Sequence, residues 1–275
     1  MIRSLLAISE GGPDAATSFG LAARLASQYG VAVDALHLPT APGGISDALG
    51  LGTDVAPLVA ELDEVRLDAR AAESRRHYEA RLLATKGATW TRAEHGDRAL
   101  MIRMGRANEM VLLGRPGGDP ENIAPATVEA ALYECAGPVM IAPPSPGAGP
   151  FRQPVVAWNA SHQAARALNY ALPFLAAAGR ATLLCVGPAH EDYGAAYVAR
   201  QLKRHGIECA TANIDPGAVS GRARGRALLG FVHEQGGDLL VMGAYGRNQA
   251  LSFLGLGGAT GKVISSCRAP LLMAH

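Results

Sequence analysis

Short apolar runs alternate with amphipathic stretches along most of the chain. In the second half, apolar runs predict strands near 154–158, 181–186, 207–213, 238–242 and 270–274. Helical periodicity between them predicts helices near 161–178, 191–205, 220–236 and 257–267. Runs that are apolar throughout, such as DLLVM and PLLMA, are typical of a parallel sheet covered on both faces. The expected fold class is therefore α/β, with a doubly wound, Rossmann-like parallel sheet.

The layout of the first half of the chain recurs in the second half. In both halves a short strand, a polar loop and an Ala-rich helix are followed by a second strand. Matching residues keep the same order: Gly30 and Gly179, Pro39 and Pro188, Gly114 and Gly243, Cys135 and Cys267. The first two pairs are each 149 positions apart, and the later offsets differ because insertions fall between elements. We therefore expect two tandem copies of one domain, with five strands each.

A Pro- and Gly-rich segment separates the two copies. Residues 143–154, PPSPGAGPFRQP, cannot continue a helix or a central strand. The predicted domains are residues 1–145 and 151–275. The first copy carries about 30 extra residues, which we expect to form a loop over 40–60 and a long helix over 58–85.

Composition narrows the function classes. Hydrophobic residues at 49% and charged residues at 18% indicate a globular protein with a filled core. Aromatic residues at 5% and a net charge of +1 without a basic cluster argue against nucleic-acid binding. No apolar stretch approaches the roughly 20 residues that span a bilayer, and the N-terminal apolar run is predicted to be a first strand. We expect a cytoplasmic protein with no membrane partner.

Motifs for metal binding or catalysis are missing from the sequence. The four cysteines form no CxxC pair, and the eight histidines form no HxxxH or HExxH motif, so no metal site is predicted. No G-x-S-x-G elbow or ordered Ser/His/Asp set stands out. The charged run 66–83 is predicted to be a solvated helix face. We predict no catalytic residues.

Three loops of the second copy are candidates for a ligand site. They are 158–162, 186–190 and 243–264, which follow strands one, two and four. In an open parallel sheet, ligands bind at the carboxyl ends of the strands, where the strand order reverses. These loops meet there if strands one and four are neighbours.

The loop 243–264 is rich in glycine and leads into an apolar helix. Its glycines would let the backbone approach a ligand closely, and the N–H groups at the helix start would favour an anion. Alternatively, the glycines only form tight turns. The residues of this candidate phosphate loop are Gly243, Gly246, Arg247, Gly257, Gly258, Ala259, Thr260 and Lys262.

These features together resemble the universal stress protein family. Its nucleotide-binding members carry G-x2-G-x9-G-[S/T] after the fourth strand, and this chain has G-x2-G-x10-G-G-A-T from Gly243 to Thr260. The segment VVAWNASHQAARAL also resembles the first strand and helix of the family. The spacer is one residue longer, and Gly258 replaces the usual hydroxyl residue. The resemblance covers essentially the whole chain, in tandem form.

The resemblance implies which residues contact an adenine nucleotide, ATP or a related one, with Mg as a candidate companion ion. Ala157 and Asn159 would lie near adenine or ribose, and Val186 would offer backbone hydrogen bonds to the adenine edge. Met242 and the phosphate loop would surround the ribose and phosphates. The family often has Asp at the position of Asn159. From the residues alone, Asn159 can equally precede a helix that Ser161 caps.

The first copy keeps only part of this pattern. Gly114-x2-Gly117 is present, but Asp119 and Glu121 follow where a phosphate would pass, and Pro125 removes an N–H donor. Because carboxylates repel phosphate oxygens, we expect no nucleotide in the first copy.

Three functions remain open. The first is a stress or regulatory protein that responds to a nucleotide bound in the second copy, with slow ATP hydrolysis at most. The second is a ligand-free interaction scaffold with vestigial pockets. The third is an adenylating enzyme, although the second copy lacks a Gly-rich loop after its first strand. The resemblance also implies pairing between the two domains through their last strands, PVMIAP and PLLMAH, while a homodimer of the whole chain is left open.

Overall fold

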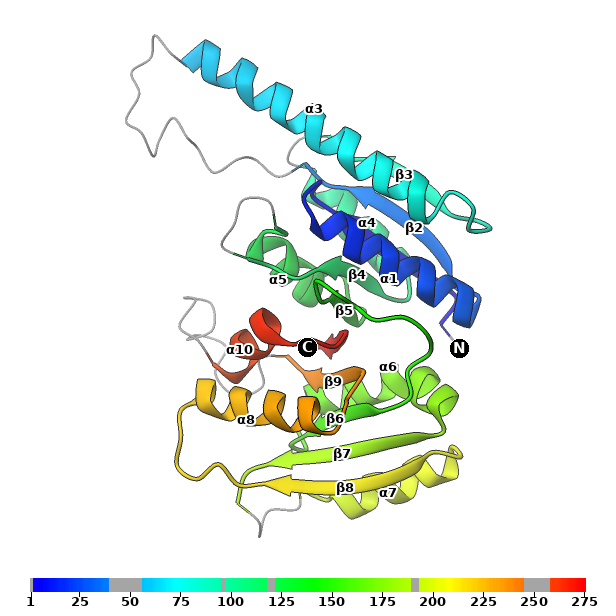
Figure 1. Ribbon diagram of the computed structural model, residues 1–275, viewed down its shortest axis with the longest axis vertical. Helices are drawn as coiled ribbons and strands as arrows, with labels where there is room; N and C mark the ends of the chain where they lie inside the picture. The colour runs from blue at the N-terminus through cyan, green and yellow to red at the C-terminus, as the bar shows by residue number, and fades with distance from the viewer. Residues whose placement is uncertain (1, 40–55, 95–96, 118–121, 189–192, 245–257) are drawn as a thin grey trace. The chain divides into compact units, whose positions relative to one another are not determined.

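The computed structural model describes most of the chain and divides it into two compact units. The described residues are 2–39, 56–94, 97–117, 122–188, 193–244 and 258–275 (Figure 1). The N-terminal unit comprises Arg3–Cys135, and the C-terminal unit comprises Ala136–His275 together with Ile2. The N-terminal repeat runs from β1 (Ser4–Ser9) to β5 (Val139–Ala142), and the C-terminal repeat runs from β6 (Pro154–Trp158) to β10 (Leu271–Ala274).

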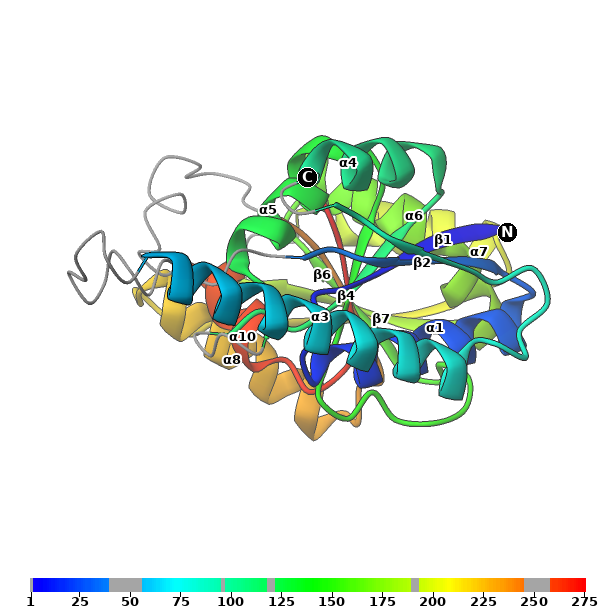
Figure 2. The same ribbon diagram turned by 90° about the horizontal axis from the view of Figure 1, so that it is seen from above.

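The N-terminal unit is a four-stranded parallel sheet with the strand order β3-β2-β1-β4. Its strands are β1 (Ser4–Ser9), β2 (Ala32–His37), β3 (Thr89–Arg92) and β4 (Val111–Gly114). Its helices are α1 (Asp14–Tyr29), α3 (Ala56–Arg81), α4 (Arg98–Ala107) and α5 (Pro125–Glu134). Figure 2 shows α1 and α3 on one face of this sheet and α4 and α5 on the other. This placement follows from right-handed crossovers that run outward from β1 in both directions.

The C-terminal unit repeats this arrangement with the strand order β5-β10-β9-β6-β7-β8. Its strands are β5 (Val139–Ala142), β6 (Pro154–Trp158), β7 (Arg180–Val186), β8 (Glu208–Ile214), β9 (Leu239–Gly243) and β10 (Leu271–Ala274). Its helices are α6 (His162–Ala178), α7 (Ala195–Arg204), α8 (Gly221–Glu234) and α10 (Ala259–Ser266). The expected doubly wound α/β fold, with five strands in each repeat, is confirmed.

The last strands of the two repeats pair with each other inside the C-terminal unit. β5 and β10 run antiparallel, with Met140 opposite Leu272. All four residues of each strand are buried. An apolar strand at a sheet edge exposes unpaired backbone groups, and this pairing removes both edges from solvent. The antiparallel meeting of PVMIAP and PLLMAH, expected from the resemblance, is present.

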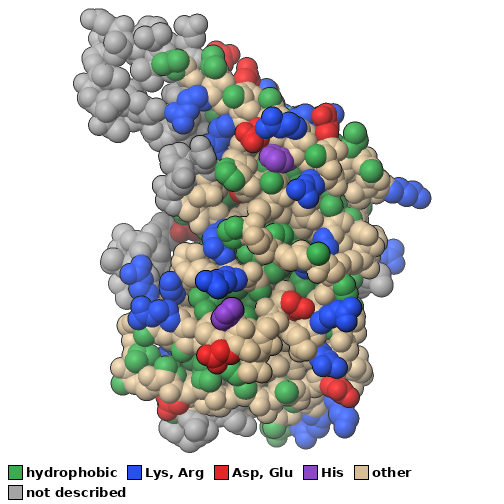
Figure 3. Space-filling model, in the orientation of Figure 1, with side chains coloured by type: hydrophobic (Ala, Val, Ile, Leu, Met, Phe, Trp, Pro, Cys, Tyr) green, Lys and Arg blue, Asp and Glu red, His purple; other side chains and the backbone are tan. Residues whose placement is uncertain are grey.

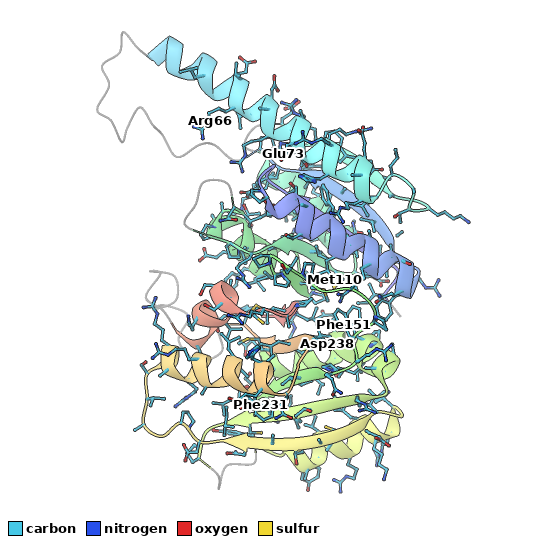
Figure 4. The ribbon with its side chains drawn as sticks, viewed as in Figure 1. Arg66, Glu73, Met110, Phe151, Phe231 and Asp238 are labelled. Carbon is cyan, nitrogen blue, oxygen red and sulfur yellow. The ribbon has the colours of Figure 1, made fainter. Side chains whose placement is uncertain are left out.

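The end of the predicted linker is fixed to the C-terminal unit. Both carboxylate oxygens of Asp238 accept backbone N–H groups, from Arg152 at 2.5 Å and from Gln153 at 2.9 Å. Next to them the ring of Phe151 packs edge-on against Phe174, with 5.7 Å between centroids. Figure 4 shows Phe151 and Asp238 close together, where the chain enters β6.

Matching turns end the first helix of each repeat. α1 ends at Gly30 and α6 at Gly179, both in the left-handed conformation with φ of 67°. Only glycine adopts this conformation without a steric penalty, and it lets the chain reverse into the next strand. These are the two glycines that revealed the repeat in the sequence.

Candidate functional site

In each repeat the first strand lies between the second and the fourth. β1 pairs with β2 and β4, and β6 pairs with β7 and β9, all in parallel. The strand order therefore reverses at β1/β4 and at β6/β9, and a crevice forms beyond the carboxyl ends of such strands. The condition under which the three loops meet, that strands one and four are neighbours, is confirmed.

In the C-terminal repeat, five residues that the sequence singled out lie at this carboxyl edge. Ala157 is next to last in β6, Val186 ends β7, and Met242 and Gly243 end β9. Asn159 follows β6 directly. The adjacent pairing of β7, β6 and β9 brings these strand ends together. Gly258 is the N-cap of α10, and Ala259 and Thr260 form its first turn. Gly246, Arg247 and Gly257 lie outside the described residues.

Gly243 has a packing role that the sequence did not reveal. A Cβ built on Gly243 would lie 2.6 Å from the backbone N of Ala164 and 2.7 Å from the backbone C of Gln163. The first turn of α6 therefore packs against the end of β9 so closely that the two backbones are in contact. Gly114 has the same role in the N-terminal repeat, where its Cβ would lie 2.4 Å from that of Asp14. Close helix packing thus explains these two glycines without a ligand.

Asn159 and Ser161 organise the loop between β6 and α6. The side-chain Oδ1 of Asn159 accepts a hydrogen bond from the N–H of Ser161 at 3.1 Å. Ser161 is the N-cap of α6, and its Oγ accepts from the N–H of Ala164 at 3.1 Å. Asn159 is exposed at the carboxyl edge. The capping role expected for Ser161 is confirmed, and Asn159 shapes the same turn.

The N-cap of α10 is Gly258, which has no side chain, so the N–H groups of the first turn receive no hydroxyl or carboxylate acceptor from that position. Two glycines of α8 pack against this helix start. A Cβ on Gly221 would lie 3.1 Å from the N of Ala259, and one on Gly225 would lie 2.9 Å from its carbonyl O.

Three arginines of α8 lie beside the two glycines that contact the start of α10. They were not predicted as site residues from the sequence. Arg222, Arg224 and Arg226 alternate with the residues around Gly225 and are all exposed. Figure 3 shows Lys and Arg side chains gathered over the N-terminal end of α8. The recognisable signal was the motif GRARGR, in which glycines permit a close approach and the arginines between them add positive charge.

Two aromatic residues, Trp158 at the end of β6 and Tyr193 just before α7, were not predicted from the sequence. The indole Nε1 of Trp158 donates to the carbonyl O of Tyr193 at 2.9 Å. The hydroxyl of Tyr193 faces Gly187, where a Cβ would lie 2.8 Å from it. Trp158 and Tyr193 are half-buried. Their side chains add aromatic surface at the carboxyl ends of β6 and β7, where Ala157 and Val186 also lie.

The N-terminal repeat presents a different carboxyl edge, built from buried ionisable groups. Glu10 follows β1, and its carboxylate contacts the start of α5. Burial and the neighbouring charge of Glu10 raise the pKa of Asp14 to about 7. Burial, with help from the Arg92 and Arg70 guanidinium groups, lowers the pKa of His37 to about 4. The residues expected to exclude phosphate here, Asp119 and Glu121, lie outside the described part of the chain.

Neither a metal centre nor a membrane span is found in the described part of the chain. No group of three or more His, Cys, Asp or Glu side chains there could hold a metal ion. None of the helices described is long and apolar enough to cross a bilayer.

Comparison with known proteins gives matches of fold at low sequence identity. No family model and no curated protein matches the sequence. A universal stress protein from Archaeoglobus fulgidus matches with a TM-score of 0.67 at 17% identity, over 98% of this chain and 95% of that chain. A functionally unknown protein from Pseudomonas aeruginosa matches with a TM-score of 0.53 at 14% identity, over 98% of this chain and 92% of that chain.

The Archaeoglobus protein and this chain have nearly the same extent, so the match spans both repeats. The chain has the fold of the universal stress proteins, in a form of tandem length.

Proposed function

We propose that the C-terminal repeat binds an adenine nucleotide, ATP or a related one, at the carboxyl edge of β6 and β9. The protein would then act as a nucleotide-responsive stress or regulatory protein. One observation carries the proposal: α10 begins at this edge with Gly258 as its N-cap, a residue that has no side chain with which to cap the helix. Such a helix start can hold a phosphate through backbone N–H groups and the helix dipole.

The arginines of α8 support binding of phosphate at the same place. Gly221 and Gly225 hold α8 against the start of α10, and Arg222 lies between them in sequence. No ion pair to Arg222, Arg224 or Arg226 is present among the described residues. Exposed arginines without carboxylate partners remain available for phosphate oxygens.

The adenine and ribose would lie toward β7. Ala157 and Val186 are half-buried at neighbouring strand ends, and Val186 offers its backbone groups. Trp158 and Tyr193 add aromatic surface beside them. A magnesium ion would be carried on the phosphates of the nucleotide, since the described residues offer no cluster of carboxylates to hold it.

A ligand-free interaction scaffold is the second candidate. Gly243 is required by the packing of α6, and Asn159 is used in the turn before α6. Two of the residues that suggested a ligand therefore have roles in the fold. The two candidates differ in whether nucleotide binds to the purified protein.

Native mass spectrometry of gently purified protein, followed by calorimetric titration with ATP, tests this proposal. We expect one adenine nucleotide per chain, and the measured mass also reports any dimer. No bound nucleotide and no heat of binding up to millimolar ATP would favour the scaffold.

Substitutions in the predicted phosphate loop should separate binding from folding. We expect Gly246→Val and Gly257→Val to abolish nucleotide binding, because a branched side chain would fill the space of the ribose and phosphates. Arg222→Ala should weaken ATP binding by about tenfold, the effect of one lost charge-assisted contact. Gly230→Ala is the control, since a Cβ there meets nothing within 4 Å. Unchanged affinity in both valine variants would show that the phosphate loop is misassigned.

A further inference from the structure

A carboxylate of the protein itself lies at the start of α5 in the N-terminal repeat. Glu10 follows the last residue of β1 and is only 1% exposed. Its Oε2 accepts a hydrogen bond from the N–H of Ala124, the N-cap of α5, at 2.8 Å. Its Oε1 accepts from the hydroxyl of Thr127 in the first turn. An anion from a distant part of the chain thus occupies a helix start that favours negative charge.

This helix start corresponds to the start of α10 in the C-terminal repeat. α5 follows β4 as α10 follows β9. Leu6 pairs with Val111 in one repeat and Val155 with Leu240 in the other, which preserves the 149-residue offset between β1 and β6. By this offset Glu10 corresponds to Asn159.

Glu10 and Asn159 differ in what they do at the helix start of their repeat. Neither Ala124 nor Gly258 caps its helix with its own side chain. In the N-terminal repeat Glu10 supplies the acceptors for α5. In the C-terminal repeat Asn159 is exposed, and its Oδ1 bonds locally to Ser161. An uncharged residue stands where the other repeat has a carboxylate.

The loop that carries Glu10 is held rigidly against α3. Gly11 has φ of +85°, and a Cβ there would lie 2.4 Å from the backbone O of Arg70. The Nε of Arg70 donates to the carbonyl O of Glu10 at 2.7 Å, and the N–H of Gly11 donates to Ser9 Oγ at 2.9 Å. α3 spans 26 residues between β2 and β3, whereas its counterpart α7 spans 10 residues between β7 and β8. The backbone of Glu10 is thus fixed by the longer crossover helix of the N-terminal repeat.

We propose that the carboxylate of Glu10 occupies, in the N-terminal repeat, the position that a ligand phosphate takes at the corresponding helix start. The side chain is an internal anion that closes this repeat to phosphate and nucleotide. Only the comparison with a filled C-terminal site rests on the proposed function. The contacts of Glu10 with Ala124 and Thr127 are independent of it.

Exchanging the two matching residues tests the proposal in both directions. Glu10→Asn removes the charge and shortens the side chain. The N-terminal repeat then has the same residue type that the C-terminal repeat has at Asn159. Calorimetric titration of the full chain with inorganic phosphate, and then with ATP, should show one more binding site per chain than wild type. Glu10→Gln is the matched control: its amide oxygen can still accept from Ala124, so no additional site should appear.

The reciprocal variant, Asn159→Glu, brings a carboxylate to the C-terminal site. ATP affinity should fall by at least about a hundredfold, because the charge would face the phosphates in a partly desolvated crevice. Circular dichroism and thermal unfolding establish that each variant is folded.

Each outcome decides a separate claim. A folded Glu10→Asn protein with no additional phosphate or ATP site would overturn the proposal. If this variant does not fold, Asn159→Glu decides, and an unchanged ATP affinity overturns it. If wild type binds no nucleotide, the proposed function fails, while an additional phosphate site in Glu10→Asn still supports the internal anion.

Discussion

Replacing Gly243 by alanine is expected to destabilise the C-terminal unit by about 3 kcal/mol or more. The added Cβ would lie 2.6 Å from the N of Ala164 and 2.7 Å from the backbone and side chain of Gln163. These contacts are mostly with backbone, so they cannot be relieved by turning a side chain. Either α6 must move away from β9 or the end of β9 must distort.

Urea unfolding followed by circular dichroism measures this change. Gly261→Ala is the matched control, because Gly261 lies in α10 and a Cβ there meets nothing within 4 Å. Alanine in a helix is favoured over glycine by about 0.5–1 kcal/mol, so this control should be slightly more stable than wild type. A loss below about 1 kcal/mol in Gly243→Ala would contradict the packing role.

The fold could be predicted because its signals are local and are repeated. β9 was expected at 238–242 and spans Leu239–Gly243, and the long helix expected at 58–85 spans Ala56–Arg81. Apolar runs and helical periodicity depend only on neighbouring residues. The repeat then indicated that both halves form the same kind of sheet, whereas the neighbourhood of strands one and four was only a condition, which the structure meets.

The role of Gly243 shows why the candidate site was harder to predict. A glycine at the end of a strand can allow either a ligand or a helix to approach the backbone. Both situations require glycine, so the sequence is the same in either case. Contact with Gln163 and Ala164 is visible only when α6 is in place. The sequence therefore could not separate a glycine for phosphate from a glycine for packing.

Glu10 was missed for a different reason. A glutamate before two glycines is usually an exposed loop residue. Its partners, Ala124 and Thr127, are 114 and 117 positions away, so no local pattern connects them. One available signal was its alignment with Asn159, which sets a charged residue opposite an uncharged one after the first strand of each repeat.

The second large effect concerns Asp14, whose substitution by asparagine should change how stability depends on pH. Asp14 is 4% exposed, and burial, together with Glu10, raises the pKa of its carboxyl from 3.8 to about 7. Between these values the folded protein holds a proton that the unfolded chain releases. The free energy of unfolding therefore falls as the pH rises from about 4 to 7, and it stays reduced above 7.

His37 acts in the opposite direction over much of the same range. Its side chain is fully buried, and burial lowers the pKa of the imidazole from 6.5 to about 4. Between these values the unfolded chain binds a proton that the folded protein does not. His37 therefore stabilises the fold above pH 6.5, and this contribution is lost as the pH falls toward 4. Because the two slopes oppose each other, the wild-type curve alone cannot reveal either group.

Difference curves between variants separate the two groups. Asp14→Asn cannot ionise, so its free energy of unfolding relative to wild type should rise steadily between pH 4 and 7, by up to about 4 kcal/mol. His37→Gln should show the complementary result: its free energy of unfolding relative to wild type should rise as the pH falls from 6.5 to 4. Urea unfolding at half-unit pH intervals measures both. A pH-independent difference between Asp14→Asn and wild type would show that Asp14 is ionised in the folded protein, and that its burial beside Glu10 does not hold the proton.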